Sequence, residues 1–388
     1  MIGVTDLADV KLQNITKQFH HQTVLDNISF DVKDKEFFVI FGHAGAGKTT
    51  ILNTIAGLYA PDSGQVLIDN REVTGVEPED RNIAMVFENY ALYPHYTVFE
   101  NIASPLKSPK HRQPQRVIEE KVIRTAKKLN IDHLLDRKPS ELSNGQRQRV
   151  GLGRALVREP EAFLMDEPLT HLDAKLRHQM RAELKEMQYH LDTTTVYVTH
   201  DYLEAMSLGD RIAILNEGKI EQIGTPYDIY YFPASEYVAQ AFGEPEINLL
   251  EGHVQTEHGK HWLAIHEIGE DFLLPEDVSR TLLERGARVL SVGLRPTDID
   301  FSRTDENGGL PGTVYSFEPL GAKAILSVKV KERIINTVTS ADEELNLDER
   351  VFLKIHLDRA VFFDRDDGKF LARSKRKGGI ERGRIAVD

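Results

Sequence analysis

The first part of the chain alternates apolar and polar residues over short stretches. Residues 10–35 contain several such segments, among them Val-Leu-Asp-Asn-Ile-Ser-Phe-Asp-Val at 24–32. Residues 63–73 alternate on either side of Asp69 and Asn70, a pair typical of tight turns. A period of two predicts β-strands, and turn residues between two such runs predict a hairpin. We therefore expect antiparallel strands here, with one hairpin turning at this pair.

Short apolar runs and helical patterns follow one another farther along. The expected strands are residues 37–41, 82–87, 161–165 and 195–199. The clearest helix is 175–191, where apolar side chains recur every three or four residues, at Leu176, Met180, Leu184, Met187 and Leu191. Such a stripe is typical of a helix face that packs on a core. Strands that alternate with helices predict an α/β layer with a mostly parallel sheet.

The pattern changes after about Gly243, where helical periodicity fades. Strand-like runs dominate from there, at 261–265, 287–294, 312–317, 324–330 and 351–357. Turn signals such as Asn307-Gly308-Gly309 lie between them, which indicates a separate all-β domain, a barrel or a sandwich. The chain from Leu371 is rich in Arg, Lys and Gly, and we interpret it as a solvated basic tail. We expect domains at 1–243 and 244–388.

Composition narrows the class of protein. A chain of 388 residues exceeds the size at which one core usually keeps growing, so two domains are expected. The net charge of −13 argues against a general nucleic-acid binder. No apolar run approaches the ~18 residues that a membrane-spanning helix needs, and the first ten residues lack the basic stretch of a secretory signal. The sequence contains no cysteine, which excludes disulfides and thiolate metal sites and suits a reducing compartment.

Residues 42–49 read Gly-His-Ala-Gly-Ala-Gly-Lys-Thr and fit the phosphate-binding loop pattern G-x-x-x-x-G-K-[ST]. The expected strand 37–41 precedes them, and apolar residues at helical spacing follow. Glycines let backbone N–H groups turn toward an anion, and the helix N-terminus adds a partial positive charge. Lys48 can reach the outer phosphates, and the Thr49 hydroxyl can ligate Mg²⁺. The loop thus predicts a nucleoside triphosphate site.

Two acids close the expected strand 161–165. Asp166 can hold Mg²⁺ through water, and Glu167 can orient or deprotonate an attacking water. Phosphoryl transfer to water needs a metal, phosphate clamps and a positioned nucleophile. A pair of exposed acids at a strand end is the alternative, and the upstream phosphate loop favours the functional interpretation.

Residues 142–146, Leu-Ser-Asn-Gly-Gln, form a polar turn that opens a helix. The turn can be a second anion site or an ordinary helix cap at Ser143, and the residues alone do not separate these readings. His200 follows the expected strand 195–199, where it can donate a hydrogen bond to a γ-phosphate. His253, His258, His261 and His266 lack ligand-type spacing, so we expect no metal there.

In this order, the phosphate loop, Leu-Ser-x-Gly-Gln, the two acids, Leu172-Asp173 and His200 resemble the nucleotide-binding subunits of ABC transporters. Residues 84–98 look like the segment of carbohydrate importers that touches the membrane subunits. Residues 293–299 are similar to an element of their C-terminal β domain. The resemblance covers essentially the whole chain and is nearest to the maltose, glycerol-phosphate and multiple-sugar import ATPases. It implies an α/β P-loop cassette, with an antiparallel β subdomain and a helical subdomain at about 89–160, followed by an OB-like all-β domain.

The resemblance also implies roles for individual residues. Phe19 would stack on adenine, Glu167 would be the general base, and His200 would contact the γ-phosphate. Thr49, Glu88 and Asp166 would hold Mg²⁺. The other phosphate-loop residues implied to bind ATP are Gly42, His43, Ala44, Gly45, Ala46, Gly47, Lys48 and Thr50. The residues implied to complete the site of a second cassette are Ser143, Asn144, Gly145, Gln146 and Asp173.

Two positions depart from the family pattern. Glu88 stands where the family has a glutamine that touches Mg²⁺ and water, and Asn144 stands where it usually has glycine. Asparagine tolerates positive φ better than most residues, but it adds a side chain where the γ-phosphate must approach. These departures question efficient hydrolysis rather than ATP binding.

The implied protein is the ATPase subunit of an importer for a sugar or polyol, at the cytoplasmic face of the membrane. Its expected partners are a second cassette, identical or paralogous, two transmembrane permeases and, indirectly, an external solute-binding protein. One rival is an ABC ATPase of DNA repair or translation, which the single cassette, the acidic charge and residues 90–98 oppose. The other is a degenerate cassette that binds ATP and regulates a partner. Glu167 and His200 oppose that reading, whereas Glu88 and Asn144 favour it.

Overall fold

The computed structural model describes residues 8–86, 92–109, 112–170, 174–191, 193–305 and 308–374. The chain divides into two compact units, Met1–Pro226 and Tyr227–Asp388. Among the described residues, none of the helices combines the length and the apolar character that crossing a bilayer requires.

The first unit opens with an antiparallel sheet of order β2-β1-β4-β5. Its strands are β1 (Ala8–Phe19), β2 (Gln22–Lys33), β4 (Ser63–Ile68) and β5 (Arg71–Glu72). The hairpin between β4 and β5 turns at Asp69 and Asn70, whose φ angles are 47° and 57°. Both are positive, as a two-residue turn between twisted strands requires, so the predicted turn is confirmed.

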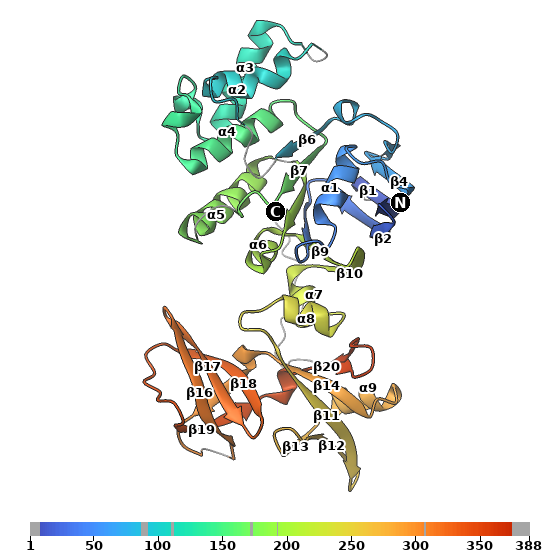
Figure 1. Ribbon diagram of the computed structural model, residues 1–388, viewed down its shortest axis with the longest axis vertical. Helices are drawn as coiled ribbons and strands as arrows, with labels where there is room; N and C mark the ends of the chain where they lie inside the picture. Colours follow the sequence, from blue (N-terminus) through green and yellow to red (C-terminus); the bar gives the residue numbers. More distant parts are fainter. Residues whose placement is uncertain are drawn as a thin grey trace, which may run out of the picture. The chain divides into compact units, whose positions relative to one another are not determined.

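A second sheet of order β10-β9-β3-β8-β7-β6 forms the centre of this unit (Figure 1). Its strands are β3 (Phe37–Phe41), β6 (Ile83–Val86), β7 (Ala162–Asp166), β8 (Thr194–Thr199), β9 (Arg211–Asn216) and β10 (Lys219–Gly224). Every pair is parallel except β9 with β10. All residues of β3 and β8 are buried, which explains the continuous apolar sequence of β3 and the β-branched and aromatic residues of β8. The predicted α/β layer with a mostly parallel sheet is confirmed.

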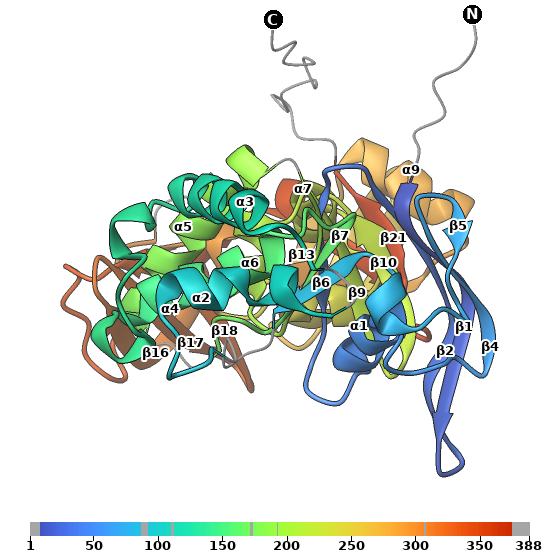
Figure 2. The same cartoon turned by 90° about the horizontal axis from the view of Figure 1, so that it is seen from above.

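The α-helices of this unit form two sets. α1 (Lys48–Ala56), α5 (Ala174–Leu191) and α6 (Tyr202–Leu208) follow β3, β7 and β8 in the chain, and α5 confirms the helix predicted at 175–191. α2 (Val98–Ala103), α3 (Gln115–Lys128) and α4 (Asn144–Leu156) lie between β6 and β7 in the sequence. These three pack on one another and form one group in both views (Figure 1 and Figure 2).

Arg81 is buried at the C-terminal end of α1, with an exposed fraction of 1%. Its guanidinium donates hydrogen bonds to the carbonyls of Thr54, Ile55, Thr74 and Val76, at 2.8–3.0 Å. Two of these carbonyls belong to the last turn of α1, where a cation complements the helix dipole. Arg81 thereby anchors the far end of the helix that begins at the phosphate loop.

The second unit consists mainly of two antiparallel sheets, of order β13-β12-β11-β14-β20-β21 and β15-β19-β16-β17-β18. The first contains β11 (Asn248–Glu257), β12 (Lys260–Ile265), β13 (Glu270–Leu273), β14 (Val289–Leu294), β20 (Val361–Asp364) and β21 (Phe370–Arg373). The second contains β15 (Ile299–Ser302), β16 (Leu310–Leu320), β17 (Lys323–Val330), β18 (Arg333–Ser340) and β19 (Arg350–Ile355). The predicted OB-like β domain is confirmed. The sequence pattern missed the short helix α9 (Glu276–Glu284).

The boundary between the units lies earlier in the chain than the one expected after Gly243. Two short helices, α7 (Pro226–Tyr231) and α8 (Glu236–Ala241), precede β11. Arg295 donates to the carbonyls of Tyr230 and Phe242, and the Phe370 N–H donates to the Ala234 carbonyl. These bonds tie the helical segment to the β unit, so helical periodicity alone misplaced the division.

Candidate active site

The register of the central sheet brings three loops to one edge. β8 lies between β3 and β7, and all three strands run parallel. Thr199 of β8 pairs with Phe41 of β3, and Val198 pairs with Asp166 of β7. The phosphate loop, the second acid and the predicted histidine each follow one of these strands. Parallel strands therefore deliver all three groups to the same sheet edge.

The phosphate loop joins β3 to α1 through a backbone that only glycine accommodates easily. Gly45 and Gly47 have φ angles of 81° and 106°. A Cβ on Gly42 would lie 2.5 Å from the Leu215 carbonyl oxygen, and one on Gly47 would lie 2.8 Å from a Leu25 methyl carbon. A cavity of about 510 Å³ opens over this loop and the start of α1. The nine residues that line it are Val24, Ala44, Gly45, Gly47, Lys48, Thr49, Thr50, Asp166 and Glu167.

Lys48 and Glu167 form an ion pair within this cavity. The Lys48 ammonium is almost buried and lies 3.2 Å from Glu167 Oε1, and it donates to the His43 carbonyl at 3.0 Å. Glu167 Oε2 lies 2.9 Å from His200 Nδ1 and accepts from the Thr170 hydroxyl at 3.2 Å. Both carboxylate oxygens are thus occupied by protein groups.

The environment of Glu167 favours its charged form. Burial by itself raises the pKa of this carboxyl, but the positive charge of Lys48 and then the contact with His200 outweigh burial. The net pKa lies below the ordinary value for glutamate, so the group is a carboxylate at neutral pH. Its backbone has a φ of 43°, an uncommon conformation for a residue with a side chain. The backbone conformation of Glu167 and the contacts of both its carboxylate oxygens together fix the position of the side chain.

The chemistry of the neighbouring residues fits a hard divalent cation. The Thr49 hydroxyl donates to Asp166 Oδ1 at 3.2 Å, so two oxygen ligands from separate elements already lie together. Oxygen donors of this kind, completed by phosphate oxygens and water, are what Mg²⁺ prefers. The residues present therefore fit the metal that the sequence predicts.

Residues 142–146 form the N-terminus of α4. Ser143 is the N-cap: its hydroxyl accepts from the Gln146 N–H at 3.3 Å, and the Gln146 side chain accepts from the Ser143 N–H at 3.0 Å. Asn144 is the first helical residue and does not have positive φ, so the expected conformational demand on asparagine is wrong. Its carboxamide oxygen accepts a hydrogen bond from Arg147 instead. The asparagine costs this turn no backbone strain.

Other predicted residues lie apart from the cavity lining or outside the described chain. Phe19 ends β1, where its ring meets Tyr59 edge-on at 5.3 Å and the Lys17 ammonium lies 5.2 Å from the ring centre. It is not among the residues that line the phosphate cavity. Glu88 and Asp173 fall outside the described residues.

Four further residues surround Glu167 and His200, and no sequence pattern pointed to three of them. The four are Thr170, Arg177, Asp201 and Glu204, which contact the two loops or one another. Their contacts join residues up to 24 positions apart, and no spacing rule for a single helix or strand brings such pairs together. Only the position of Thr170 close behind Glu167 hinted at a role.

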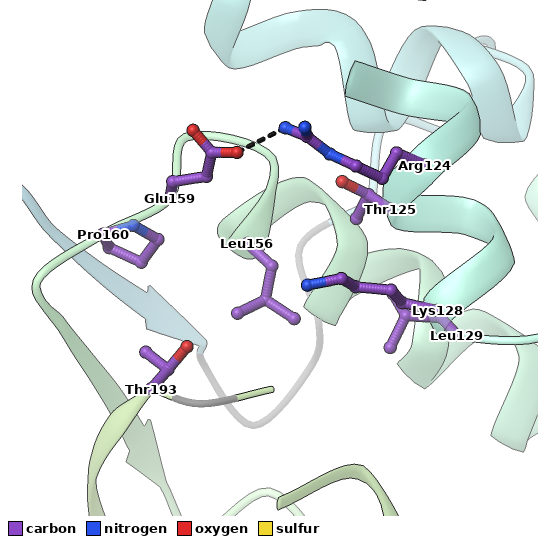
Figure 3. A pocket seen from close by; sticks show the side chains of 8 residues that line it. All are labelled: Arg124, Thr125, Lys128, Leu129, Leu156, Glu159, Pro160 and Thr193. Carbon is purple, nitrogen blue, oxygen red and sulfur yellow. Dashed lines mark hydrogen bonds and ion pairs between the residues drawn. The ribbon is translucent and has the colours of Figure 1, made fainter. Parts of the chain in front are cut away.

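A second, smaller cavity of about 230 Å³ lies where α3 and α4 approach the turn before β7 (Figure 3). Lys128 and Arg124 line it, which could suggest another anion site. However, both cations are exposed, and Glu159 already pairs with Arg124 and, at 3.0 Å, with Lys121. The site is better explained as an ionic link that fastens this turn to α3.

Comparisons with known proteins agree with this geometry. Residues 25–170 match the family described as ABC transporter, and residues 292–363 match the TOBE domain. The chain is 40% identical over 365 residues to an uncharacterized ABC transporter ATP-binding protein, YurJ, of Bacillus subtilis, covering 92% of this chain and 98% of that protein. It is 48% identical over 319 residues to the sn-glycerol-3-phosphate import ATP-binding protein UgpC of Pectobacterium atrosepticum, covering 81% and 86%.

Among solved structures, the chain is similar to cbiO1 of Clostridium perfringens, part of the ABC transporter complex cbiONQ. The TM-score is 0.53 at 27% identity, covering 57% of this chain and 90% of that one. Two relatives above 30% identity are covered over most of their length, and the phosphate loop, paired acids and histidine meet at one sheet edge. The chain therefore belongs to the family of ABC transporter ATP-binding proteins and is an ATPase of that family.

Proposed function

We propose that this chain powers an importer for a sugar, a polyol or a polyol phosphate by hydrolysing ATP. The observation that carries the proposal is the cluster of Lys48, Glu167 and His200 at the phosphate loop, with Thr49 and Asp166 beside it. The solute class follows from the relatives named sn-glycerol-3-phosphate import ATP-binding proteins. We place the chain at the cytoplasmic face of the membrane.

The cluster suggests how the ATPase reaction proceeds. The loop backbone and the Lys48 ammonium bind the outer phosphates of ATP, and Phe19 stacks on the base. Lys48 must therefore leave Glu167 when the phosphates arrive. Glu167 is then free to accept the proton of the attacking water, while His200 donates a hydrogen bond to the γ-phosphate.

Thr49 and Asp166 would hold Mg²⁺, and Glu88 is a further candidate ligand. When bound, the metal would neutralise charge that develops on the phosphate oxygens.

We propose that a second cassette completes each site. Ser143, Asn144, Gly145 and Gln146 would face the γ-phosphate bound by the partner, with Asp173 at the interface. In this structure α4 presents its N-terminus through a complete capping box, and helix N-termini attract anions. Because Asn144 is helical and has no positive φ, its backbone does not oppose a pair of identical chains.

The turn at residues 93–97 is the proposed contact with the permeases. The side chains of Tyr93 and Tyr96 are 46% and 36% exposed, and their rings lie 5.1 Å apart. Asn101 is fully buried beneath them and bonds to both the N–H and the carbonyl of Tyr93, and to the Tyr96 carbonyl. The buried amide fixes the turn, so the aromatic rings form a preorganised surface for a helix of another protein.

A reconstituted complex tests the proposal. The chain is combined in liposomes with the permeases encoded beside it and with their solute-binding protein, and phosphate release is measured with and without candidate solutes. We expect ATPase activity that rises severalfold with the transported sugar or polyol phosphate. Activity that ignores every solute and permease would reject the import function.

Replacing Tyr93 with glutamate tests the docking surface separately. A charge among the aromatic rings should release the chain from permease-containing membranes without changing nucleotide affinity, because the turn lies outside the phosphate cavity. Tyr315→Glu, a change at a 58% exposed tyrosine of the second unit, is the matched control. Equal membrane recovery of both variants would contradict the assignment.

A further inference from the structure

Arg177 of α5 connects the two loops that carry the proposed catalytic side chains. Its Nη2 donates to the Thr170 carbonyl at 3.4 Å, in the loop after β7. Its Nη1 donates to Asp201 Oδ2 at 3.3 Å, in the loop after β8. The two side chains of this ion pair are 31% and 17% exposed, so solvent screens the pair only in part.

The first of these contacts leads to Glu167. Thr170 accepts from Arg177 with its carbonyl and donates from its hydroxyl to Glu167 Oε2 at 3.2 Å. The Thr170 N–H also donates to the Glu167 carbonyl at 3.3 Å, closing a tight turn. A cation that holds this turn therefore fixes the direction of the Glu167 carboxylate.

The second contact leads to His200. The Asp201 N–H donates to the Thr199 hydroxyl at 3.0 Å, so the residues on either side of the histidine are joined. Asp201 Oδ1 caps α6 by accepting from the N–H groups of Leu203 and Glu204, at 2.8 and 3.2 Å. Its other oxygen is left for Arg177, which holds the histidine loop toward α5.

Carboxyl groups packed beneath the loop that carries His200 make a nearby positive charge stabilising. Glu204 is 3% exposed and accepts from the Tyr197 and Thr199 hydroxyls, at 2.9 and 2.6 Å. Burial raises the pKa of Glu204, and the charge of Asp201 raises it further, whereas Arg177 lowers it. Without Arg177, the carboxylates of this loop would face one another with less compensation.

We propose that Arg177 is a positioning residue for ATP hydrolysis, which sets the geometry between Glu167 and His200 by holding both of their loops. The contacts form a closed circuit: Glu167 to Thr170, Thr170 to Arg177, Arg177 to Asp201, and the adjacent His200 back to Glu167 at 2.9 Å. The inference rests on the proposed roles of Glu167 and His200.

The circuit requires arginine rather than any cation. Two nitrogens of one planar guanidinium reach the two loops, whereas a lysine ammonium is a single point charge on a flexible stem. Lysine at 177 can keep the ion pair with Asp201 and lose the hold on Thr170. Methionine keeps an unbranched apolar stem in place of the arginine stem and loses both contacts.

The test compares Arg177→Met and Arg177→Lys with Arg181→Met. Arg181 lies one turn farther along α5 and contacts only the exposed His178 of the same helix among the described residues, at 3.4 Å. We expect Arg177→Met to lower kcat by about tenfold or more, because small misplacements of reacting groups are costly. Arg177→Lys should be intermediate, and Arg181→Met should match the wild type. ATP affinity should stay within about twofold in all three.

A double-mutant cycle shows whether Arg177 acts through His200. In a His200→Ala background, Arg177→Met should lower kcat by a smaller factor than in the wild type, since one of the two groups that it positions is gone and only Glu167 remains. Full multiplication of the two effects would overturn the proposal. So would a loss of ATP affinity and thermal stability parallel to the loss of kcat, because that pattern indicates a general structural role.

The experiment also allows for a variant that does not fold and for a wild type that shows no turnover. If Arg177→Met does not fold, Asp201→Asn replaces it, since asparagine still caps α6 but loses the ion pair; wild-type kcat in this variant would overturn the inference. If the wild type itself shows no turnover with its permeases, the proposed function fails first. Wild-type turnover together with unchanged kcat in Arg177→Met rejects only the role of Arg177.

Discussion

Changing Glu167 to glutamine should separate ATP binding from ATP hydrolysis. The substitution keeps the size of the side chain and its ability to accept from the Thr170 hydroxyl, which lies 3.2 Å away. It removes the negative charge that lies 3.2 Å from the Lys48 ammonium and 2.9 Å from His200. It also removes the group proposed to accept the proton of the attacking water.

The two effects have different sizes and opposite signs. Loss of a positioned general base lowers kcat by about 10² to 10⁴. Nucleotide affinity should rise, because the ion pair with Lys48 no longer has to be broken when the phosphates bind. A partly exposed ion pair contributes about 1 kcal/mol at most, which corresponds to an increase of about fivefold in affinity.

Fluorescent ATP titration and steady-state phosphate release measure the two quantities on the same preparation. Glu161→Gln is the matched control, since Glu161 precedes the opposite end of β7 and contacts Arg71 and Asn82. We expect the control to behave as the wild type in both assays. Unchanged turnover in Glu167→Gln would reject the base assignment, and weakened ATP binding would refute the competition for Lys48.

Two other predictions concern the stability of the first unit. Arg81→Met should lower the free energy of unfolding by about 3–5 kcal/mol, because it removes the guanidinium donor from four carbonyls, two of them at the end of α1. Denaturation in urea measures this, and a loss below about 1 kcal/mol would contradict the capping role. Glu204→Gln should flatten the dependence of Tm on pH. Burial raises the folded-state pKa of Glu204, so the stability it confers is full at low pH and is lost as pH rises through that pKa. Scanning calorimetry between pH 5 and 8 should show a smaller decline for the variant, and an equal decline in both proteins would disprove the reasoning.

The parts of the fold that could be predicted depend on local sequence. β3 is uniformly apolar and β8 is rich in β-branched residues because both strands are buried on both faces, and the Asp69-Asn70 turn requires two positive φ angles. The order of the strands in the sheet is not needed to predict that the loops after them lie close together, since parallel strands place their carboxyl ends at the same edge of the sheet. This rule predicts that the phosphate loop and the paired acids meet.

The parts that escaped prediction depend on contacts between distant residues. Helix α9 buries Val278 and Leu282 at helical spacing, but this short segment stands alone among strand-like runs, and that context concealed it. Arg177 flanks the apolar stripe of α5, and its partners are on two other loops. Asn144 seemed a backbone problem because glycine is usual there, yet the capping box makes the position helical.

The contacts of Glu167 suggest how the proposed base is restrained while the phosphate loop is empty. Before ATP arrives, the carboxylate is tied to Lys48 on one oxygen and to His200 and Thr170 on the other. Under the proposed mechanism, the phosphates of ATP compete with Glu167 for the Lys48 ammonium. Binding would then free the proposed base when its substrate is in place, while the Thr170 hydroxyl keeps its contact with the carboxylate. In this proposal, the ion pair between Lys48 and Glu167 links occupancy of the phosphate loop to the availability of the base.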